Sequence, residues 1–242
     1  MMQHMVLSSP MAVTFLKQSL IPPGTLFPQW VIDEINGAGS KSHALNVSGI
    51  IAANSQMPGD YGAVGRWVEQ ELANKGLPLN SGKGIDVPPY NIEIKTRAVQ
   101  ATSAHTFGKL TFGDIVRRPW KESDIAAKCQ LHYRLMWDAE FMCVNRDFII
   151  DFRQREQQTV FEQAFNQARA TLISHYQSQS PKSISILRRT PQINGLFLET
   201  DRKGNVDYSS LSAVVYQWRA SDGFMKKWEV AGCKNTYHQL FE

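Results

Sequence analysis

Apolar residues recur at helical spacing in two stretches of the chain. In the first, about residues 62–75, Val64, Val68 and Leu72 share one face with Trp67, which predicts an amphipathic helix. The Lys-Gly pair at 75–76 marks its end, because glycine commonly follows the last turn of a helix. The second stretch, about residues 155–177, predicts another amphipathic helix. Its apolar stripe consists of Val160, Phe161, Ala164, Phe165, Ala168, Leu172, Ile173 and Tyr176.

Alternation of apolar and polar residues predicts strands elsewhere. In residues 92–99, the apolar positions 92 and 94 alternate with Glu93, Lys95 and Arg97. Further strands are predicted at 107–112, 132–137 and 148–152, and Ser123 has the character of an N-cap that begins a short helix. After Pro181 the pattern is β-rich, with strands predicted at 183–189, 195–200 and 213–220 and a turn at 201–205.

No composition break divides the chain into separate folding units. The first sixty residues are rich in Pro, Gly, Ser and Asn, and they predict loops around one or two short helices. The order of the later elements predicts one α/β domain over residues 1–242, with a central mixed β-sheet flanked by helices.

Composition excludes several classes of protein. Hydrophobic residues make up 43% and charged residues 20% of the 242 residues, which excludes a disordered or collagen-like chain. Cys129, Cys143 and Cys233 lie far apart, so we expect reduced core thiols rather than a zinc finger or a disulfide scaffold. No run approaches the ~18 apolar residues of a membrane span, and the apolar stretch 11–16 is too short for a signal peptide. A cytoplasmic protein is expected.

Positive charge is concentrated in the middle of the chain. The formal net charge is +4, yet residues 95–134 hold eight Lys or Arg against three Asp or Glu, a local charge of +5. This concentration is compatible with a nucleic-acid partner, although a solvated surface would also account for it.

The candidate chemistry lies in residues 84–95. Glu93 and Lys95 are two apart on a predicted strand and therefore share a face. Asp86 precedes Glu93 by seven residues across a Pro-Pro turn, so a hairpin can fold it back beside the strand. Carboxylate oxygens are the ligands that Mg²⁺ prefers, and a nearby ammonium can orient water and offset charge on a phosphate. The alternative is a surface strand whose exposed face happens to be Glu-Lys-Arg.

Asp86, Glu93 and Lys95 resemble the motif of the PD-(D/E)XK restriction-endonuclease-like nucleases. Their spacing is similar to that of the mismatch-repair nicking endonuclease MutH and the type II restriction enzymes related to it, although Ile85 stands where the family has proline. Residues 65–69 resemble the Gly-x-x-x-Glu helix of that group, whose acid joins the metal site, which would assign this role to Glu69. Glu71 competes with Glu69 as the relevant acid, and a solvated helix carboxylate is the simpler interpretation of either.

The resemblance implies a function. It implies a restriction-endonuclease-like fold and a Mg²⁺-dependent endonuclease, with Mn²⁺ able to substitute, that cuts duplex DNA to leave 5′-phosphate and 3′-hydroxyl ends. Asp86 and Glu93 would bind the metal, Lys95 would position the water, and Glu69 would support the metal. In this scheme residues 1–60 are loop-rich, 62–152 form the catalytic core, and 153–242 hold the long helix and a β-rich DNA-contact part.

Several cations are candidates for contacts with DNA. His105, in a predicted loop at 101–107, can contact a phosphate or relay a proton, although a histidine without a chemical role is an equal alternative. Turns and hairpins near the C-terminal cations would reach DNA phosphates or base edges. The full set is Arg97, His105, Lys109, Arg188, Arg189, Arg202 and Lys203.

Two other functions stay open on the sequence alone. One is a DNA-binding module that keeps the fold without hydrolysis, which the intact Asp86, Glu93 and Lys95 disfavour. The other is a phage or recombination nuclease that resolves junctions, which requires a dimer with two symmetric sites. For a site-specific restriction or nicking enzyme we expect a monomer, or a dimer when both strands are cut.

Overall fold

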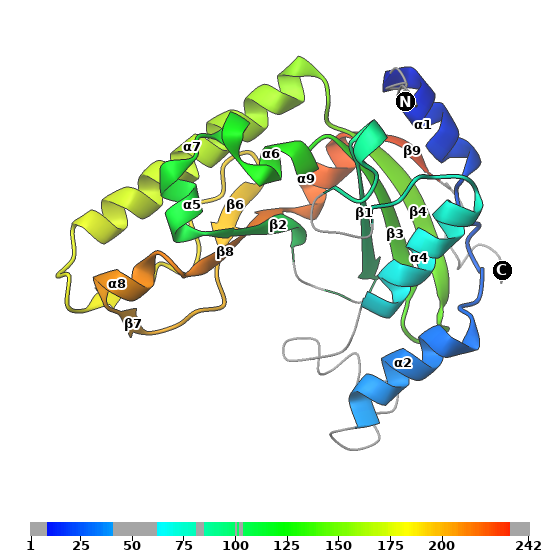
Figure 1. Cartoon of the computed structure of the whole chain (residues 1–242), viewed down its shortest axis with the longest axis horizontal. Helices are drawn as coiled ribbons and strands as arrows, with labels where there is room; N and C mark the ends of the chain where they lie inside the picture. The colour runs from blue at the N-terminus through cyan, green and yellow to red at the C-terminus, as the bar shows by residue number, and fades with distance from the viewer. Residues whose placement is uncertain (1–8, 41–61, 81–84, 100, 102–103, 233–242) are drawn as a thin grey trace, which may run out of the picture. The chain divides into compact units, whose positions relative to one another are not determined.

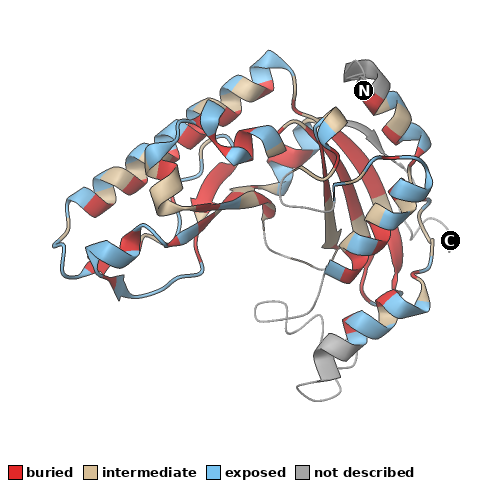
Figure 2. Cartoon of the chain, in the orientation of Figure 1, coloured by how far each residue is buried: buried red, intermediate tan, exposed pale blue. Residues whose placement is uncertain are grey.

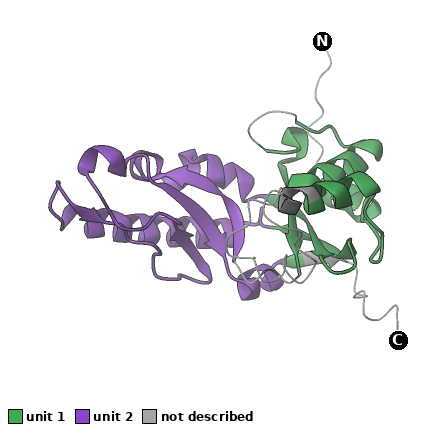
Figure 3. Cartoon of the chain, turned by 90° about the horizontal axis from the view of Figure 1, so that it is seen from below, with its two compact units in different colours: residues 1–103, 131–151, 229–242 green, residues 104–130, 152–228 purple. Residues whose placement is uncertain are grey.

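The computed structural model describes residues 9–40, 62–80, 85–99, 101 and 104–232 (Figure 1). The chain forms two compact units (Figure 3). Unit 1 comprises residues 1–103, 131–151 and 229–242, and unit 2 comprises residues 104–130 and 152–228. The chain passes between the units four times, so neither unit is a continuous piece of the sequence. The single domain over residues 1–242 stays a prediction.

Unit 1 is built on a four-stranded mixed sheet. Its strands are β1 (Ile92–Ala98), β3 (Leu131–Asp138), β4 (Cys143–Asp151) and β9 (Glu229–Gly232), in the order β1-β3-β4-β9. β1 runs parallel to β3, whereas β4 is antiparallel to both of its neighbours. The helices α1 (Ser9–Gln18), α2 (Gln29–Ser40) and α4 (Gly62–Asn74) flank this sheet, and α4 packs on β1.

The core of unit 1 joins these helices to one face of the sheet. Figure 2 shows β3 and β4 as largely buried, and the Phe27 ring contacts those of Trp67 and Trp137 with centroids 5.1 and 5.7 Å apart. One carboxylate, Asp147 of β4, is completely buried, and its Oδ2 accepts hydrogen bonds from the Ile21 N–H at 2.6 Å and the Tyr133 hydroxyl at 2.7 Å. Burial raises the pKa of Asp147. The side chain therefore links the segment after α1 to the sheet.

Unit 2 holds an antiparallel sheet and most of the remaining helices. β2 (His105–Thr111), β8 (Val215–Ala220) and β6 (Leu196–Glu199) form the sheet in the order β2-β8-β6, and β5 (Ile184–Ser185) pairs with β7 (Asn205–Val206). The helices are α5 (Phe112–Arg117), α6 (Asp124–Lys128), α7 (Arg155–Gln177), α8 (Tyr208–Leu211) and α9 (Asp222–Lys227). Helix α7 contributes Phe161 and Phe165 to an aromatic core with Trp120 and Trp218.

The α/β class with a mixed sheet and flanking helices is confirmed. Helix α7 has the predicted bounds, α4 ends one residue early, and the Ser123 side chain caps α6 by accepting from the Ala126 N–H at 3.2 Å. The strand predicted at 107–112 begins instead at His105, and Phe112 opens α5 because Thr111 caps that helix. Residues 195–200 and 213–220 do pair, but β7 and α8 lie between them in the chain, so 201–205 is not a simple hairpin tip.

Two further expectations concern cysteines and membranes. Cys129 and Cys143 are buried thiols outside any disulfide, and burial raises the pKa of Cys143 to about 11. Cys233 lies outside the described residues. Within the described ranges, every helix is too short or too polar to cross a lipid bilayer.

Gly195 has a backbone conformation and a close packing that a larger residue would not fit. Its φ is +88°, and a Cβ there would lie 2.8 Å from Ser221 Oγ and 2.9 Å from Phe224 Cβ. We expect Gly195→Ala to lower the free energy of unfolding by about 2–4 kcal/mol, measured by chemical denaturation. Gly65→Ala is the control, because its Cβ would meet nothing closer than Thr96 Oγ1 at 3.9 Å. That change should stabilise the helix by up to about 1 kcal/mol, and equal losses at both positions would contradict this reasoning.

Candidate active site at the edge of β1

Strand β1 presents Glu93 and Lys95 on one face, as predicted. The flanking Ile92 and Ile94 are buried in the core of unit 1 and fix the strand. The Glu93 side chain is 1% exposed and that of Lys95 is 31% exposed, and the Lys95 ammonium forms an ion pair with Glu93 Oε1. A carboxylate and an ammonium are therefore held together on rigid backbone at the first strand of the sheet.

Asp86 returns to β1 through a tight turn. Pro88–Tyr90 form a single 3-10 turn, Asn91 takes a left-handed conformation with φ 52°, and Val87 bridges to Ile92. Asp86 Oδ2 accepts a hydrogen bond from the backbone N–H of Ile94 at 2.6 Å. Because β3 occupies the other side of β1, Asp86 lies at the outer edge of the sheet. The predicted return of Asp86 to the strand is thus observed, with a one-residue bridge in place of a longer hairpin. Residues 81–84, the predicted loop before it, lie outside the described residues.

Helix α4 adds Glu69 to this group. Burial raises the pKa of Glu69, and the negative charge of Asp86 raises it further. Lys95 and Arg66 act in the opposite direction, and Glu93 adds a smaller upward effect. The Glu69 carboxyl group is therefore close enough to Asp86, Glu93 and Lys95 to respond to their charges. All four predicted catalytic residues lie in unit 1, on α4, before the Pro88–Tyr90 turn and on β1.

The donor set suits a hard cation. Glu69, Asp86 and Glu93 supply carboxylate oxygens only, and mutual repulsion among them is relieved by a bound cation. Among the described residues, no group of three or more His, Cys, Asp or Glu side chains is arranged to hold a metal ion by itself. Mg²⁺ does not require such a group, because it is usually bound through one or two carboxylates together with water and substrate phosphate. Asp86 and Glu93 are the two carboxylates that the sequence predicted for this role.

Two of the predicted DNA-contact residues, Arg97 and His105, are engaged within the protein. Arg97 Nη2 donates to the Ala101 carbonyl oxygen at 2.6 Å, which ties this guanidinium to the end of the strand. His105 was expected in a loop, and this is wrong, because it is the first residue of β2 and is 6% exposed. Its Nε2 lies 2.6 Å from Asp222 Oδ1, so the ring links β2 to α9. A buried, engaged ring gives no support to a phosphate contact by His105.

The C-terminal cations differ in their surroundings. Arg188 is exposed, and Arg189, also exposed, places its guanidinium 3.8 Å from the ring centroid of Phe197. Arg202 and Lys203 are exposed, in the irregular segment between β6 and β7. Lys109 is also exposed, and it lines, with Arg202, a cavity of about 610 Å³ in unit 2 whose walls include Val214 and Gln217.

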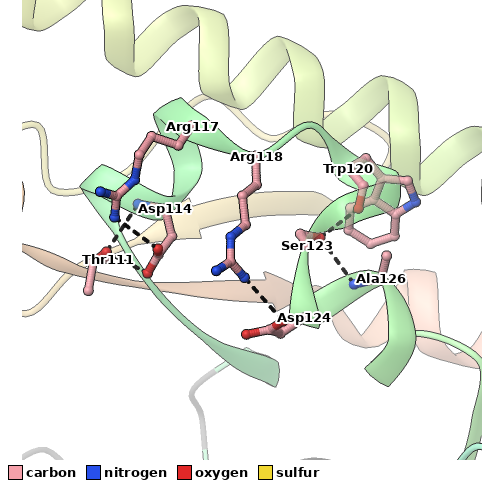
Figure 4. Close-up of polar contacts among 8 residues, drawn as sticks. All are labelled: Thr111, Asp114, Arg117, Arg118, Trp120, Ser123, Asp124 and Ala126. Atoms are coloured by element: carbon pink, nitrogen blue, oxygen red, sulfur yellow. Dashed lines mark hydrogen bonds and ion pairs between the residues drawn. The ribbon is translucent and has the colours of Figure 1, made fainter.

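Two other cations of the basic segment are partly neutralised (Figure 4). Arg117 Nη2 lies 3.3 Å from Asp114 Oδ1, and Arg118 Nη1 lies 3.3 Å from Asp124 Oδ1. The hydrogen bond from Thr111, followed by the contact with Arg117, lowers the pKa of Asp114 and keeps this acid ionised. Counting cations in residues 95–134 therefore overstates the charge that this segment offers to a phosphate.

Two residues of β3 lie beside the site and were missed in the sequence. His132 and Arg134 pair in register with Glu93 and Lys95, and both are buried polar residues. Residues 132–137 were predicted as a strand, but a strand prediction does not identify the neighbouring strand. Their position beside Glu93 and Lys95 follows only from the parallel pairing of β1 with β3 and from the register of that pairing.

No protein-family model matches the chain, and no curated protein sequence matches it.

Proposed function

We propose that this protein is a Mg²⁺-dependent endonuclease with a restriction-endonuclease-like fold, which hydrolyses phosphodiester bonds in duplex DNA as a site-specific type II restriction or nicking enzyme. The observation that carries the proposal is the convergence of Glu69, Asp86, Glu93 and Lys95 at the edge of β1. These residues come from two segments of the chain, so their meeting is not a consequence of sequence proximity.

Each side chain has a role that its surroundings support. Asp86 and Glu93 would hold Mg²⁺, which when bound supplies positive charge to stabilise the phosphate as it is attacked. Lys95, which is partly exposed, would orient the water and offset negative charge at the phosphate. Glu69 would complete the acidic side of the site from α4. Mn²⁺ should substitute, because it accepts the same oxygen ligands.

The distribution of charge supports a polyanionic substrate. Unit 2 contains 16 Lys or Arg and 9 Asp or Glu, a net charge of +7, whereas unit 1 contains 10 and 13, a net charge of −3. The positive excess of the chain therefore belongs to the β-rich unit, and the carboxylates to the unit with the proposed site. Binding of phosphates by unit 2 would supply sequence-independent affinity that falls with salt.

Plasmid cleavage tests the proposal directly. Supercoiled plasmids of several sequences, with and without methylation, are incubated with the protein and Mg²⁺, and the products are resolved and their ends mapped. We expect nicked or linear DNA with 5′-phosphate ends, abolished by chelation and restored by Mg²⁺ or Mn²⁺. Duplex binding without cleavage on every plasmid would overturn the enzymatic role and favour a DNA-binding module.

Variants of Glu69 and Glu71 test which face of α4 belongs to the active site. We expect Glu69→Gln to reduce the cleavage rate by at least about tenfold, because it removes a charge that faces Asp86 and Lys95. Glu71→Gln is the matched control on the same helix and should change the rate little. Single-turnover cleavage of a labelled duplex measures both. The reverse ranking would mean that the other face of the helix meets the substrate.

Arg202 and Lys203 test the contact with DNA. Arg202→Ala and Lys203→Ala should weaken binding to cognate and random duplexes alike and lower the slope of log affinity against log salt by roughly one unit each. A loss confined to one position of one sequence would instead indicate a base contact by Arg202. Arg155→Ala, at an exposed cation that begins α7, is the control. If the turn variants behave like this control, the DNA surface lies elsewhere.

A further inference from the structure

The pocket of about 610 Å³ in unit 2 lies on the sheet of that unit, and all of its lining residues belong to unit 2. Its volume is within the range of about 300–1,000 Å³ that is typical of sites for small ligands. Val215 and Gln217 of β8 line it from the sheet face opposite to Trp218, which is buried in the aromatic core. Lys109 of β2 pairs in register with Gln217 and shares that face. The sheet therefore supplies an apolar side chain, an amide and a cation to one pocket.

The rest of the apolar wall comes from segments between β6 and β8. Val206 and Val214 line the pocket and are buried, whereas Val215 is 45% exposed although it belongs to a strand. An exposed apolar side chain inside a pocket gains free energy when a ligand covers it. The wall therefore favours a ligand with an apolar face over a small hydrated ion.

Two cations line the same pocket. Lys109 and Arg202 are exposed, and neither cationic group has a hydrogen bond or ion pair with another described residue. Glu199, on the neighbouring strand, is instead engaged in an ion pair with Arg219. Among the described residues that line the pocket, Asp201 is the only acid, so the cations exceed the acids by one. The pocket therefore attracts an anionic group.

The Gln217 amide is fixed in one orientation. Its Oε1 accepts hydrogen bonds from Arg219 Nε at 3.0 Å and from the Thr106 hydroxyl at 3.2 Å. Because arginine only donates hydrogen bonds, the amide oxygen must face Arg219. The amide Nε2 donates to Asp201 Oδ2 at 3.3 Å and keeps a second N–H, while the carboxylate keeps further acceptor sites. A donor and a strong acceptor therefore stand side by side in the lining of the pocket.

A guanine nucleotide matches the wall, the cations and this polar pair. The Watson–Crick edge of guanine carries the O6 acceptor next to two N–H donors, so it can accept from Gln217 and donate to Asp201. Adenine has one acceptor and one donor group on that edge and cannot give the carboxylate two adjacent N–H groups. The phosphate of the nucleotide would bind Lys109 and Arg202, and the flat face of its base would cover Val215.

We propose that this pocket binds one unpaired guanine nucleotide, supplied free or by a DNA strand. A base within a duplex is already paired along its Watson–Crick edge, so it must leave the helix to enter such a pocket. The inference goes beyond the proposed nuclease, because it requires neither metal nor cleavage.

Binding of small ligands and of DNA hairpins tests the proposal. Calorimetry is carried out in the presence of a chelator with guanosine 5′-monophosphate, adenosine 5′-monophosphate and inorganic phosphate. Two hairpins with the same stem follow, one fully paired and one with a single unpaired guanosine. Lys109→Met removes a cation and Asp201→Asn removes the carboxylate. Lys182→Met is the control, because Lys182 is an exposed lysine of unit 2 outside the pocket.

We expect guanosine monophosphate to bind at least about tenfold more tightly than adenosine monophosphate or phosphate. Lys109→Met should weaken both nucleotides by about tenfold, whereas Lys182→Met should leave them unchanged. Asp201→Asn should weaken guanosine monophosphate by about tenfold and leave phosphate equal or tighter, because it removes both the acceptor for guanine and a charge that repels the anion. A general electrostatic surface would not produce these opposite changes.

The hairpins identify the source of the nucleotide. Tighter binding of the hairpin with the unpaired guanosine, lost in Asp201→Asn, indicates a nucleotide of a DNA strand. A preference for guanosine monophosphate without a preference between the hairpins indicates a free nucleotide. The proposal is overturned if the parent protein shows neither preference, or if Asp201→Asn leaves the observed preference unchanged.

Discussion

Asp86→Asn should abolish most DNA cleavage while leaving the fold and duplex binding intact. The amide oxygen of asparagine can still accept the hydrogen bond from the Ile94 N–H that Asp86 Oδ2 now accepts at 2.6 Å. The negative charge that would hold Mg²⁺ is lost, so we expect the rate to fall by about 10²–10³-fold or more. Binding of duplex without metal should stay equal or tighten, since an acid that repels phosphate has been removed.

A buried carboxylate elsewhere in unit 1 provides the control for Asp86. Asp138 Oδ1 accepts hydrogen bonds from the backbone N–H groups of Glu140 and Phe141 at 2.9 and 3.2 Å. Asp138→Asn preserves that acceptor in the same way and should leave cleavage unchanged. Comparable rates for Asp86→Asn, Asp138→Asn and the parent protein would remove Asp86 from the active site.

The ion pair of Glu93 and Lys95 should show strong energetic coupling even without any substrate. Lys95→Met leaves the Glu93 carboxylate, which is 1% exposed, without its ammonium partner. We expect this change to lower the free energy of unfolding by about 1–3 kcal/mol, a range reduced because Lys95 is partly solvated. Glu93→Gln combined with Lys95→Met removes both charges and should cost less than the sum of the single changes. Chemical denaturation of the four proteins gives the coupling energy.

An exposed ion pair of unit 1 provides a reference value for the coupling energy of Glu93 and Lys95. Arg66 and Glu34 form an ion pair with side chains 49% and 44% exposed, and their coupling should be well below 1 kcal/mol. If Glu93 and Lys95 are additive within about 0.5 kcal/mol, their contact contributes nothing to the fold. The cycle is independent of the nuclease hypothesis, because it reports only on the folded state.

Local pattern was sufficient for much of the fold and for the candidate site. Helices α4 and α7 have long apolar stripes, and their positions follow from spacing alone. The relation between Glu93 and Lys95 is equally local, because residues two apart in a strand share a face. Asp86 required one further step, the turn at Pro88–Tyr90, which Pro-Pro signals directly.

The pattern of apolar and polar residues did not predict the features that depend on strand pairing between segments far apart in the sequence. His105 and Thr106 carry no apolar alternation, and His105 belongs to β2 because Ala220 pairs with it 115 residues later. The exposed turn at 201–205 was predicted, but the pairing of Asn205 and Val206 with β5 could not be read from their composition. His132 and Arg134 appear as ordinary polar positions of a strand until β3 is placed next to β1.

Strand β9 completes the sheet of unit 1 only after the whole of unit 2 has been synthesised. It pairs with β4 at the edge of the unit 1 sheet opposite β1, and it is formed by residues 229–232, after the whole of unit 2 in the chain. While the ribosome is still making unit 2, β4 has β3 on one side and an unpaired row of backbone groups on the other. Such an edge can pair with another chain. Ribosomes stalled before and after residue 232 should therefore carry nascent chains that differ in sensitivity to protease and in tendency to associate, although every residue of the proposed active site has already been made.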